Sequence, residues 1–269
     1  MNSLEKTMVA TLKDLKANHS VIGVKAEFEA EGTRMEEALR LKEVVISAGL
    51  DLTIKIGGCE ALKDMYDSRS IGVSRIVAPM IESAYAMTKF IEATRVAFPK
   101  DELDDIRFAI NVETKSMHER LEELLANPVV KDLDSVVIGR GDLSCSFGLT
   151  REMINCPQIF AVSKDIAAKC KKAGLRIGMG GGVSGDSIEF FNKLDGLLDF
   201  YETRKVIFDA PLALKGDPGA GILKAVGFEL MWLKNKRNYY GAIHQEDSTR
   251  IKHLEAHYSK LIEAAGGKH

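Results

Sequence analysis

The sequence has few of the residues that mark a disulfide-stabilised or membrane-embedded chain. Its 269 residues include four cysteines, at positions 59, 145, 156 and 170. None of them forms a C-x-x-C pair, so we expect reduced thiols and neither a zinc site nor a disulfide framework. No uninterrupted apolar segment approaches the ~20 residues that cross a bilayer. Residues Met1–Lys6 show no secretory pattern. We therefore expect a cytoplasmic protein with no membrane partner.

The chain also lacks an excess of charge of either sign. It contains 37 Lys and Arg residues against 39 Asp and Glu residues, for a formal net charge of -2. No cluster of Lys and Arg stands out along the sequence, so the electrostatic footprint of a nucleic-acid-binding protein is missing. We therefore expect a small molecule as the binding partner, and no nucleic acid.

What the sequence does contain is a repeated alternation of apolar strands with amphipathic helices, which predicts an α/β fold with a parallel sheet. So many repeats favour closure into a TIM-type (β/α)8 barrel. Only seven strands are evident, one fewer than such a barrel requires, so either the barrel is incomplete or one strand is cryptic. The predicted strands are Val21–Phe28, Leu52–Ile56, Arg75–Ala78, Ile106–Val112, Ser135–Ile138, Leu175–Met179 and Asp199–Phe208.

The pattern changes after Pro211, where Lys215–Gly221 is rich in turn residues. Two helices follow, near Leu223–Asn235 and Thr249–Ala265. The first of them carries more apolar residues than a lone surface helix. We therefore expect a single barrel domain over residues 1–269, in which residues 211–269 form a helical extension used to assemble a homo-oligomer.

Two of the predicted strands end in a carboxylate, Glu113 after Ile106–Val112 and Asp142 after Ser135–Ile138. The carboxyl ends of parallel strands meet at one end of a barrel, where such folds place their ligands. Carboxylate oxygens suit hard cations, and Mg²⁺ keeps several waters beside one or two of them. The pair predicts a divalent metal site, although acids at strand ends also cap helices and hold loops.

The residues around these acids resemble a known family. Val112-Glu113-Thr114, the stretch Ile138–Gly148 and the Pro-Met turn of Ile76–Ser83 are similar to motifs of the HpcH/HpaI aldolase and citrate lyase β-subunit family, over roughly Val21–Asp209. The resemblance implies a TIM-barrel lyase in which Glu113 and Asp142 hold a divalent metal that binds a pyruvate-like substrate. It also makes Val21–Phe28 the counterpart of the family's second strand, which implies that the first strand of the barrel is atypical or missing. Mg²⁺ or Mn²⁺ is the expected ion, with Co²⁺ a further option.

Charged residues alternate along the first predicted strand. Lys25, Glu27 and Glu29 share one face of it, and Lys55 ends the next strand. Inward charges of this kind must be paired, so a purely structural ion network is one explanation. The other is functional: Lys55 binds the substrate carboxylate, one of Glu27, Glu29 or Glu31 acts as general base, and Lys25 tunes the pKa of that base. A Schiff-base route through Lys25 or Lys55 also stays open.

Further candidates for binding the substrate follow the later strands. The glycine-rich stretch Gly178–Ser187, with Gly181 within it, predicts either a phosphate site or close backbone packing. Arg140 and Gly141, beside Asp142, are candidates for binding a substrate anion, and a loop salt bridge is the alternative for Arg140. Thr203-Arg204-Lys205 on the last predicted strand adds positive charge.

The chain departs from the family at two positions. Aldolases of the family carry a catalytic His just after their second strand and an Arg at the end of their third. This chain has Glu27–Gly32 at the first position and Lys55–Gly58 near the second. The identity of the base and of the carboxylate anchor is therefore open.

Together, these features predict a lyase of class II aldolase type that makes or breaks a carbon–carbon bond through a metal-stabilised enolate of pyruvate or a related 2-oxo acid, with an aldehyde or related acceptor. Three alternatives to this prediction remain. They are a citrate-lyase-like CoA-ester lyase, a phosphonopyruvate-type enzyme, and a barrel that binds a 2-oxo acid or phosphate without turning it over.

Overall fold

A computed structural model describes residues 1–194 and 196–267. Its core is a closed barrel in which each strand pairs with the next and the eighth returns to the first. The predicted barrel is thus confirmed. The strands are β1 (Val21–Glu27), β2 (Asp51–Lys55), β3 (Arg75–Ala78), β4 (Arg107–Val112), β5 (Ser135–Gly139), β6 (Arg176–Gly180), β7 (Phe200–Glu202) and β8 (Val206–Asp209).

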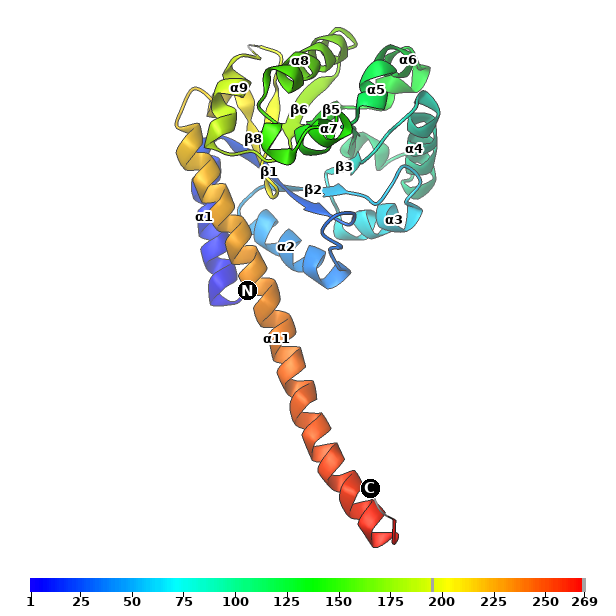
Figure 1. The fold of residues 1–269 in the computed structure, drawn as a ribbon, viewed down its shortest axis with the longest axis vertical. Helices are drawn as coiled ribbons and strands as arrows, with labels where there is room; N and C mark the ends of the chain where they lie inside the picture. Colours follow the sequence, from blue (N-terminus) through cyan, green and yellow to red (C-terminus); the bar gives the residue numbers. More distant parts are fainter. Residues whose placement is uncertain (195, 268–269) are drawn as a thin grey trace. The chain divides into compact units, whose positions relative to one another are not determined.

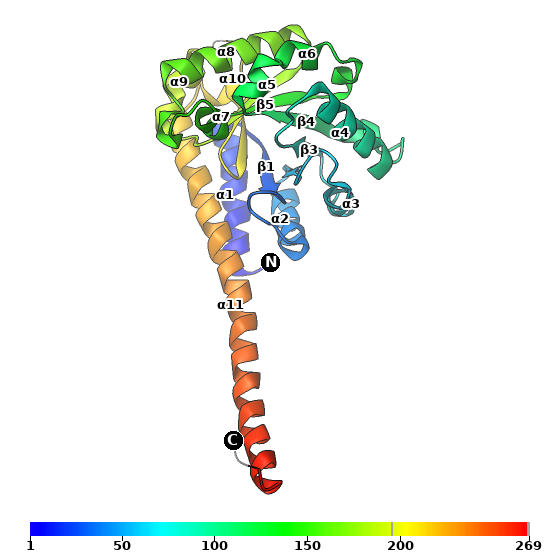
Figure 2. The same ribbon diagram turned by 45° about the vertical axis from the view of Figure 1, so that its right-hand side comes forward.

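Helices cover the outside of the barrel, as Figures 1 and 2 show for α3, α4, α6 and α8. Their apolar faces and both faces of the strands are buried, which explains why the strands read as near-continuous apolar runs. The longer helices are α1 (Ser3–His19), α2 (Met35–Ser47), α3 (Leu62–Ile71), α4 (Ala84–Ala97) and α8 (Pro157–Lys172). Shorter ones are α5 (Lys115–Glu119), α6 (Leu121–Leu125), α7 (Arg140–Ser146), α9 (Ile188–Asn192) and α10 (Ala210–Ala213).

The prediction of one strand over Asp199–Phe208 is wrong. The chain reverses at Arg204-Lys205, where the Thr203 backbone N–H donates to the Val206 carbonyl at 3.0 Å and the Val206 N–H donates to Thr203 Oγ1 at 3.1 Å. β7 and β8 are therefore an antiparallel hairpin, and β8 also runs antiparallel to β1. Thr203, Arg204 and Lys205 lie at the turn rather than along a strand.

This hairpin answers the question of the missing first strand. The position before β1 in the barrel is occupied by β8, which enters from the opposite direction. Seven parallel strands and one antiparallel strand close the barrel. The eighth strand could not be recognised from the pattern because β7 and β8 together look like one apolar run.

The prediction of two C-terminal helices is also wrong, because one helix, α11, extends over Pro218–Ala264. No proline interrupts it after its first residue, and Gly241 is tolerated at a cost of about 1 kcal/mol. The chain divides into two compact units, Met1–Glu229 with the barrel and Leu230–His269 with most of α11. Among the described residues, no helix combines the length and apolarity that a bilayer crossing requires.

Candidate functional site

A cavity of about 410 Å³ opens at the carboxyl ends of the parallel strands. Eight of the nine residues predicted to form a site line it, although they come from five strands and the segments that follow them. They are Lys25, Glu27, Glu29, Lys55, Glu113, Gly141, Asp142 and Gly181. The barrel thus brings together side chains that lie up to about 150 residues apart in the sequence, at the end where such folds bind their ligands.

Glu113 is a carboxylate of this cavity whose two oxygens each accept a hydrogen bond. It is buried, its Oε1 accepts a hydrogen bond from the Met80 backbone N–H at 3.0 Å, and its Oε2 accepts one from Asn111 Nδ2 at 2.9 Å. Burial raises the pKa of Glu113, against the opposing effect of these donors and of Lys55. The result is a fixed, desolvated carboxylate, which a nearby cation would stabilise.

Two backbone features make room for Glu113. Met80 follows Pro79 with φ +48°, a left-handed conformation that is uncommon for a residue other than glycine. This conformation accompanies the hydrogen bond from the Met80 N–H to Glu113. Gly139 lies on the other side, and a Cβ there would be 2.5 Å from Glu113 Oε2. The Pro-Met turn therefore supplies a hydrogen-bond donor to Glu113, and Gly139 leaves space for its side chain.

Asp142 lies in the first turn of α7, just beyond β5, and lines the same cavity. Its side chain is 41% exposed, and Arg151 lies 3.2 Å from its Oδ1. The charge of Asp142 contributes to the raised pKa of Glu113, which places the two carboxylates within electrostatic reach of each other. The predicted pair is thus assembled on one side of the cavity.

The donors around Glu113 and Asp142 fit a hard divalent cation. The described residues contain no group of three or more His, Cys, Asp or Glu side chains that could enclose a metal, but Mg²⁺ is commonly held by one or two carboxylates and several waters. Asn111 adds a further oxygen, because its Oδ1 is buried and makes no hydrogen bond within the described part of the chain. The site therefore offers carboxylate and amide oxygens as ligands for a cation, and one of them, Asn111 Oδ1, has no partner among the described residues.

A second group of charges lies across the cavity floor. Lys25 forms ion pairs with Glu202 and, at 3.2 Å, with Glu27. Burial opposes its charge, but these two carboxylates outweigh burial and raise the pKa of Lys25. Burial also acts against ionised Glu27, whereas Lys25, Lys55 and Arg204 lower its pKa overall. Lys25 is consequently protonated near neutral pH, which disfavours a Schiff base at this residue.

Lys55 and Glu29 form the more accessible pair of the cavity. Lys55 Nζ lies 2.7 Å from Glu29 Oε2 and 3.8 Å from Glu27 Oε1. Glu31, the third acid considered as a base, is absent from the cavity lining and instead pairs with Lys205 and Arg204 of the β7–β8 turn. Among the three glutamates, Glu29 alone lines the cavity without being enclosed by several cations.

The remaining predicted residues have structural roles. Arg140 is fully buried and does not line the cavity. Its guanidinium donates to the carbonyls of Gly180 and Gly181 and to the side chains of Asn155 and Ser187. It therefore supports the cavity wall and is not placed to bind a substrate anion. Gly181 packs so closely on α7 that a Cβ would lie 2.4 Å from the Gly141 nitrogen, in line with the packing explanation of the glycine-rich stretch.

Four residues of the site escaped the sequence analysis: Asn111, Arg151, Glu202 and the Met80 backbone. Asn111 precedes Glu113 by two residues on β4, so strand alternation could have placed both on one face. Glu202 lies inside what looked like one uninterrupted strand. Arg151 lies nine residues beyond Asp142, and no sequence spacing links the two.

The pair of Lys25 with Glu27 makes stability depend on pH. A carboxyl whose pKa is lowered on folding stabilises the protein above its unfolded pKa, and this contribution is lost as the pH falls through the folded value. We expect Glu27→Gln to lower the free energy of unfolding at pH 7 by about 3 kcal/mol, because it removes one partner of buried cations. The deficit should shrink below about pH 4.5.

Urea unfolding at pH 7 and at pH 3.5 measures this difference. Glu60→Gln is the matched control, since Glu60 pairs with Lys89 on the surface and should cost less than about 1 kcal/mol. An equal deficit for Glu27→Gln at both pH values would show that the charge of Glu27 does not stabilise the fold.

The comparisons with known proteins bear on this same region. Residues 54–179 match the model of the HpcH/HpaI aldolase/citrate lyase family. The matched stretch extends from β2 to β6 and includes the Pro-Met turn, Glu113 and Asp142. No curated protein matches the chain in sequence.

Solved structures share the fold at low identity. An HpcH/HpaI aldolase from Desulfitobacterium hafniense DCB-2 aligns with a TM-score of 0.57 and 16% identity, over 71% of this chain and 89% of that one. An HpcH/HpaI aldolase/citrate lyase family protein from Burkholderia cenocepacia J2315 aligns with a TM-score of 0.59 and 14% identity, over 84% and 90%. The citrate synthase SbnG aligns with a TM-score of 0.55 and 13% identity, over 86% and 90%.

The resemblance seen in the sequence motifs is thereby confirmed, and it supports a lyase-type function. Residues 54–179, which carry both carboxylates of the cavity, are similar to the HpcH/HpaI aldolase/citrate lyase family.

Proposed function

We propose that this protein is a metal-dependent carbon–carbon lyase of class II aldolase type that acts on pyruvate or a related 2-oxo acid through its enolate. The observation that carries the proposal is the convergence of Glu113, Asp142, Lys55 and Glu29 on one cavity at the carboxyl end of the barrel. Glu113 and Asp142 are suited to binding a metal ion. Lys55 is suited to binding a substrate carboxylate, and Glu29 is suited to accepting a proton.

Glu113 and Asp142 are the residues that would hold the cation, and Asn111 orients Glu113. Mg²⁺ or Mn²⁺ fits these oxygen donors, and family members generally depend on divalent metals. A bound divalent cation supplies Lewis-acid stabilisation for the negative charge that develops on the ketone oxygen of a 2-oxo acid.

The chain's own residues supply the rest of the chemistry. Lys55 binds the substrate carboxylate as a point charge, in place of the bidentate fork of an arginine. Glu29 accepts the proton from C3, because its carboxylate faces the cavity and is less enclosed by cations than that of Glu27. Glu202 and Glu27 keep Lys25 protonated, so Lys25 adds positive charge to the cavity without becoming a nucleophile.

Proton exchange at the methyl group of pyruvate tests the reaction class. In D₂O with Mg²⁺, wild-type protein should remove the methyl signal in proton NMR spectra. Glu113→Ala and Asp142→Ala should each slow exchange by at least about 100-fold, because charge stabilisation at the oxyanion is lost. Circular dichroism should show that both variants remain folded.

Glu119→Ala, which removes an exposed carboxylate of α5, is the control and should exchange at the wild-type rate. Undiminished exchange in both site variants would rule out the proposed metal residues. If the wild-type protein exchanges no proton at any metal concentration, pyruvate enolisation is refuted, and a CoA ester or a phosphonate becomes the next substrate class to test.

The base is tested by comparing neighbouring glutamates. Glu29→Gln should lower the rate of exchange by about 100-fold or more with little change in KM, because general-base catalysis contributes about 10²–10⁴-fold. Glu31→Gln makes the same chemical change two residues away and outside the cavity lining, so its loss should be much smaller. Equal losses in steady-state kinetics of the two variants would contradict the assignment of Glu29.

We also propose that residues 230–264 assemble the protein into a homo-oligomer. Apolar side chains recur there at alternating spacings of three and four residues, the heptad pattern of a coiled coil. Each of them is more than half exposed. They are Leu230, Leu233, Ile251, Leu254, Tyr258 and Leu261. Polar residues interrupt the pattern between 237 and 247. Because the stripe is self-complementary, a second copy of the chain is the partner that it fits best.

Light scattering during size-exclusion chromatography measures the assembly directly. We expect a mass of at least two chains, which Leu254→Lys should shift toward the monomer because it places a charge in the apolar seam. Ala256→Lys adds the same charge on the outer face of the helix and should leave the mass unchanged. A monomeric wild-type protein would refute the proposal.

A further inference from the structure

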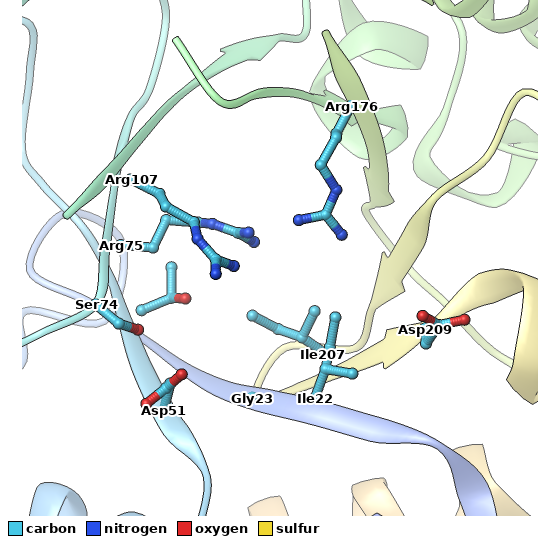
Figure 3. Close-up of a pocket in the computed structure, with 10 residues that line it drawn as sticks. Ile22, Gly23, Asp51, Ser74, Arg75, Arg107, Arg176, Ile207 and Asp209 are labelled. Atoms are coloured by element: carbon cyan, nitrogen blue, oxygen red, sulfur yellow. The ribbon is translucent and has the colours of Figure 1, made fainter. Parts of the chain in front are cut away.

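A second cavity, the lower cavity, lies at the opposite end of the barrel from the cavity of the candidate active site, which is the upper cavity. It has a volume of about 210 Å³, and its lining comes from the amino ends of five parallel strands and from the carboxyl end of β8 (Figure 3). The lining residues are Ile22, Gly23, Asp51, Thr53, Ser74, Arg75, Arg107, Arg176, Ile207 and Asp209. None of them was predicted to belong to a site, and none lines the upper cavity.

Three arginines from β3, β4 and β6 point into this cavity. Figure 3 shows the guanidinium groups of Arg75, Arg107 and Arg176 directed toward its interior from neighbouring walls. Arg75 is the deepest, with a side chain that is only 7% exposed, and its Nε makes no hydrogen bond to any described residue. A buried guanidinium donor without a partner is costly, so it points to a ligand that would accept this hydrogen bond.

The carboxylates nearby compensate these cations incompletely. Asp134 lies 3.2 Å from Arg75 and 3.9 Å from Arg176, so one acid serves two arginines. Arg107 makes no ion pair within the described residues. Asp51 and Asp209 also line the cavity, but Figure 3 shows them on the side away from the guanidinium groups, and Asp209 accepts the backbone N–H of Leu212.

An apolar layer separates this cavity from the candidate active site. Val137 lines the upper cavity, Ile207 lines the lower one, and Phe200 packs with both, all three being at most 2% exposed. The guanidinium groups of Arg75 and Arg176 lie 5.1 and 5.5 Å from the centre of the Phe200 ring. Both arginines therefore pack against the same aromatic ring, at the side of the cavity that faces the candidate active site.

We propose that this arginine-lined cavity binds a small oxyanion of the phosphate class. Guanidinium groups match the oxygens of phosphate with paired hydrogen bonds. The cavity has room for such an ion and a few waters, since each water occupies about 30 Å³. Binding there would offset part of the positive charge of three neighbouring guanidinium groups at the amino end of the barrel. This inference is independent of the proposed lyase activity, because no residue is shared between the two cavities.

Titration calorimetry with inorganic phosphate tests the proposal, with chloride balancing the ionic strength. The wild-type protein should show saturable binding at one site per chain. Arg107→Gln should weaken binding by about tenfold, because each charge-assisted hydrogen bond contributes on that order. Arg107→Gln combined with Arg176→Gln should weaken it by about a hundredfold. Arg107 is exposed, so the single variant should fold even if the double variant does not.

Arg95→Gln is the matched control, because Arg95 pairs with Asp132 on the surface away from both cavities, and its phosphate affinity should equal that of the wild type. Absence of saturable binding to the wild-type protein would overturn the proposal. So would an unchanged affinity in Arg107→Gln, since phosphate would then bind elsewhere, as at the glycine-rich turn beside Gly181.

Discussion

The hydrogen bonds that β8 makes to both of its neighbours are the constraint on which the rest of the structure depends. Without β8, the seven parallel strands would leave β1 and β7 as open edges, each with unpaired backbone donors and acceptors. The reversed strand closes both edges at once. Its short turn also places Arg204 in the lining of the cavity, where it pairs with Glu27, and Lys205 beside Glu31. Closure of the barrel and the electrostatics of the site are therefore linked.

Buried charge then determines what the cavity can do. On one side, cations surround Glu27 and carboxylates surround Lys25, so these groups stay ionised and hold one another. On the other side, burial raises the pKa of Glu113, and the hydrogen bonds that it accepts from neutral donors offset this effect only in part. The first arrangement is stable by itself, whereas the second gains most from an added cation. This contrast is the physical reason to assign a metal to Glu113 and Asp142.

Much of this could be predicted from the sequence because it depends on local patterns. Apolar runs that alternate with helices gave the barrel, and strand-end carboxylates gave Glu113 and Asp142. The reversal at Arg204-Lys205 could not be predicted, because only pairing with the distant β1 distinguishes two short strands from one long one. The expectation that Arg140 binds a substrate anion was wrong for a related reason. Its position beside Asp142 suggested a ligand, but the α7 backbone directs its side chain into the wall.

The lower cavity shows the same limit of sequence patterns. Arg75, Arg107 and Arg176 each begin a strand, and at the amino end of a barrel such residues usually contribute to stability. Nothing in their spacing joins them, since the barrel alone brings their guanidinium groups to one place. The two ends of this barrel thus differ in character. Carboxylate oxygens that could bind a metal are prominent in the upper cavity, and guanidinium groups that could bind an anion are prominent in the lower cavity.

Binding of Mn²⁺ measured by electron paramagnetic resonance tests the central claim most directly, because it needs no knowledge of the substrate. The proposed site predicts one bound Mn²⁺ per chain in the wild-type protein. Binding should be lost or weakened at least about tenfold in Glu113→Gln and in Asp142→Asn, each of which removes one anionic ligand. Mn²⁺ binding of unchanged strength in both variants, or none in the wild-type protein, would contradict the assignment of these carboxylates to a metal.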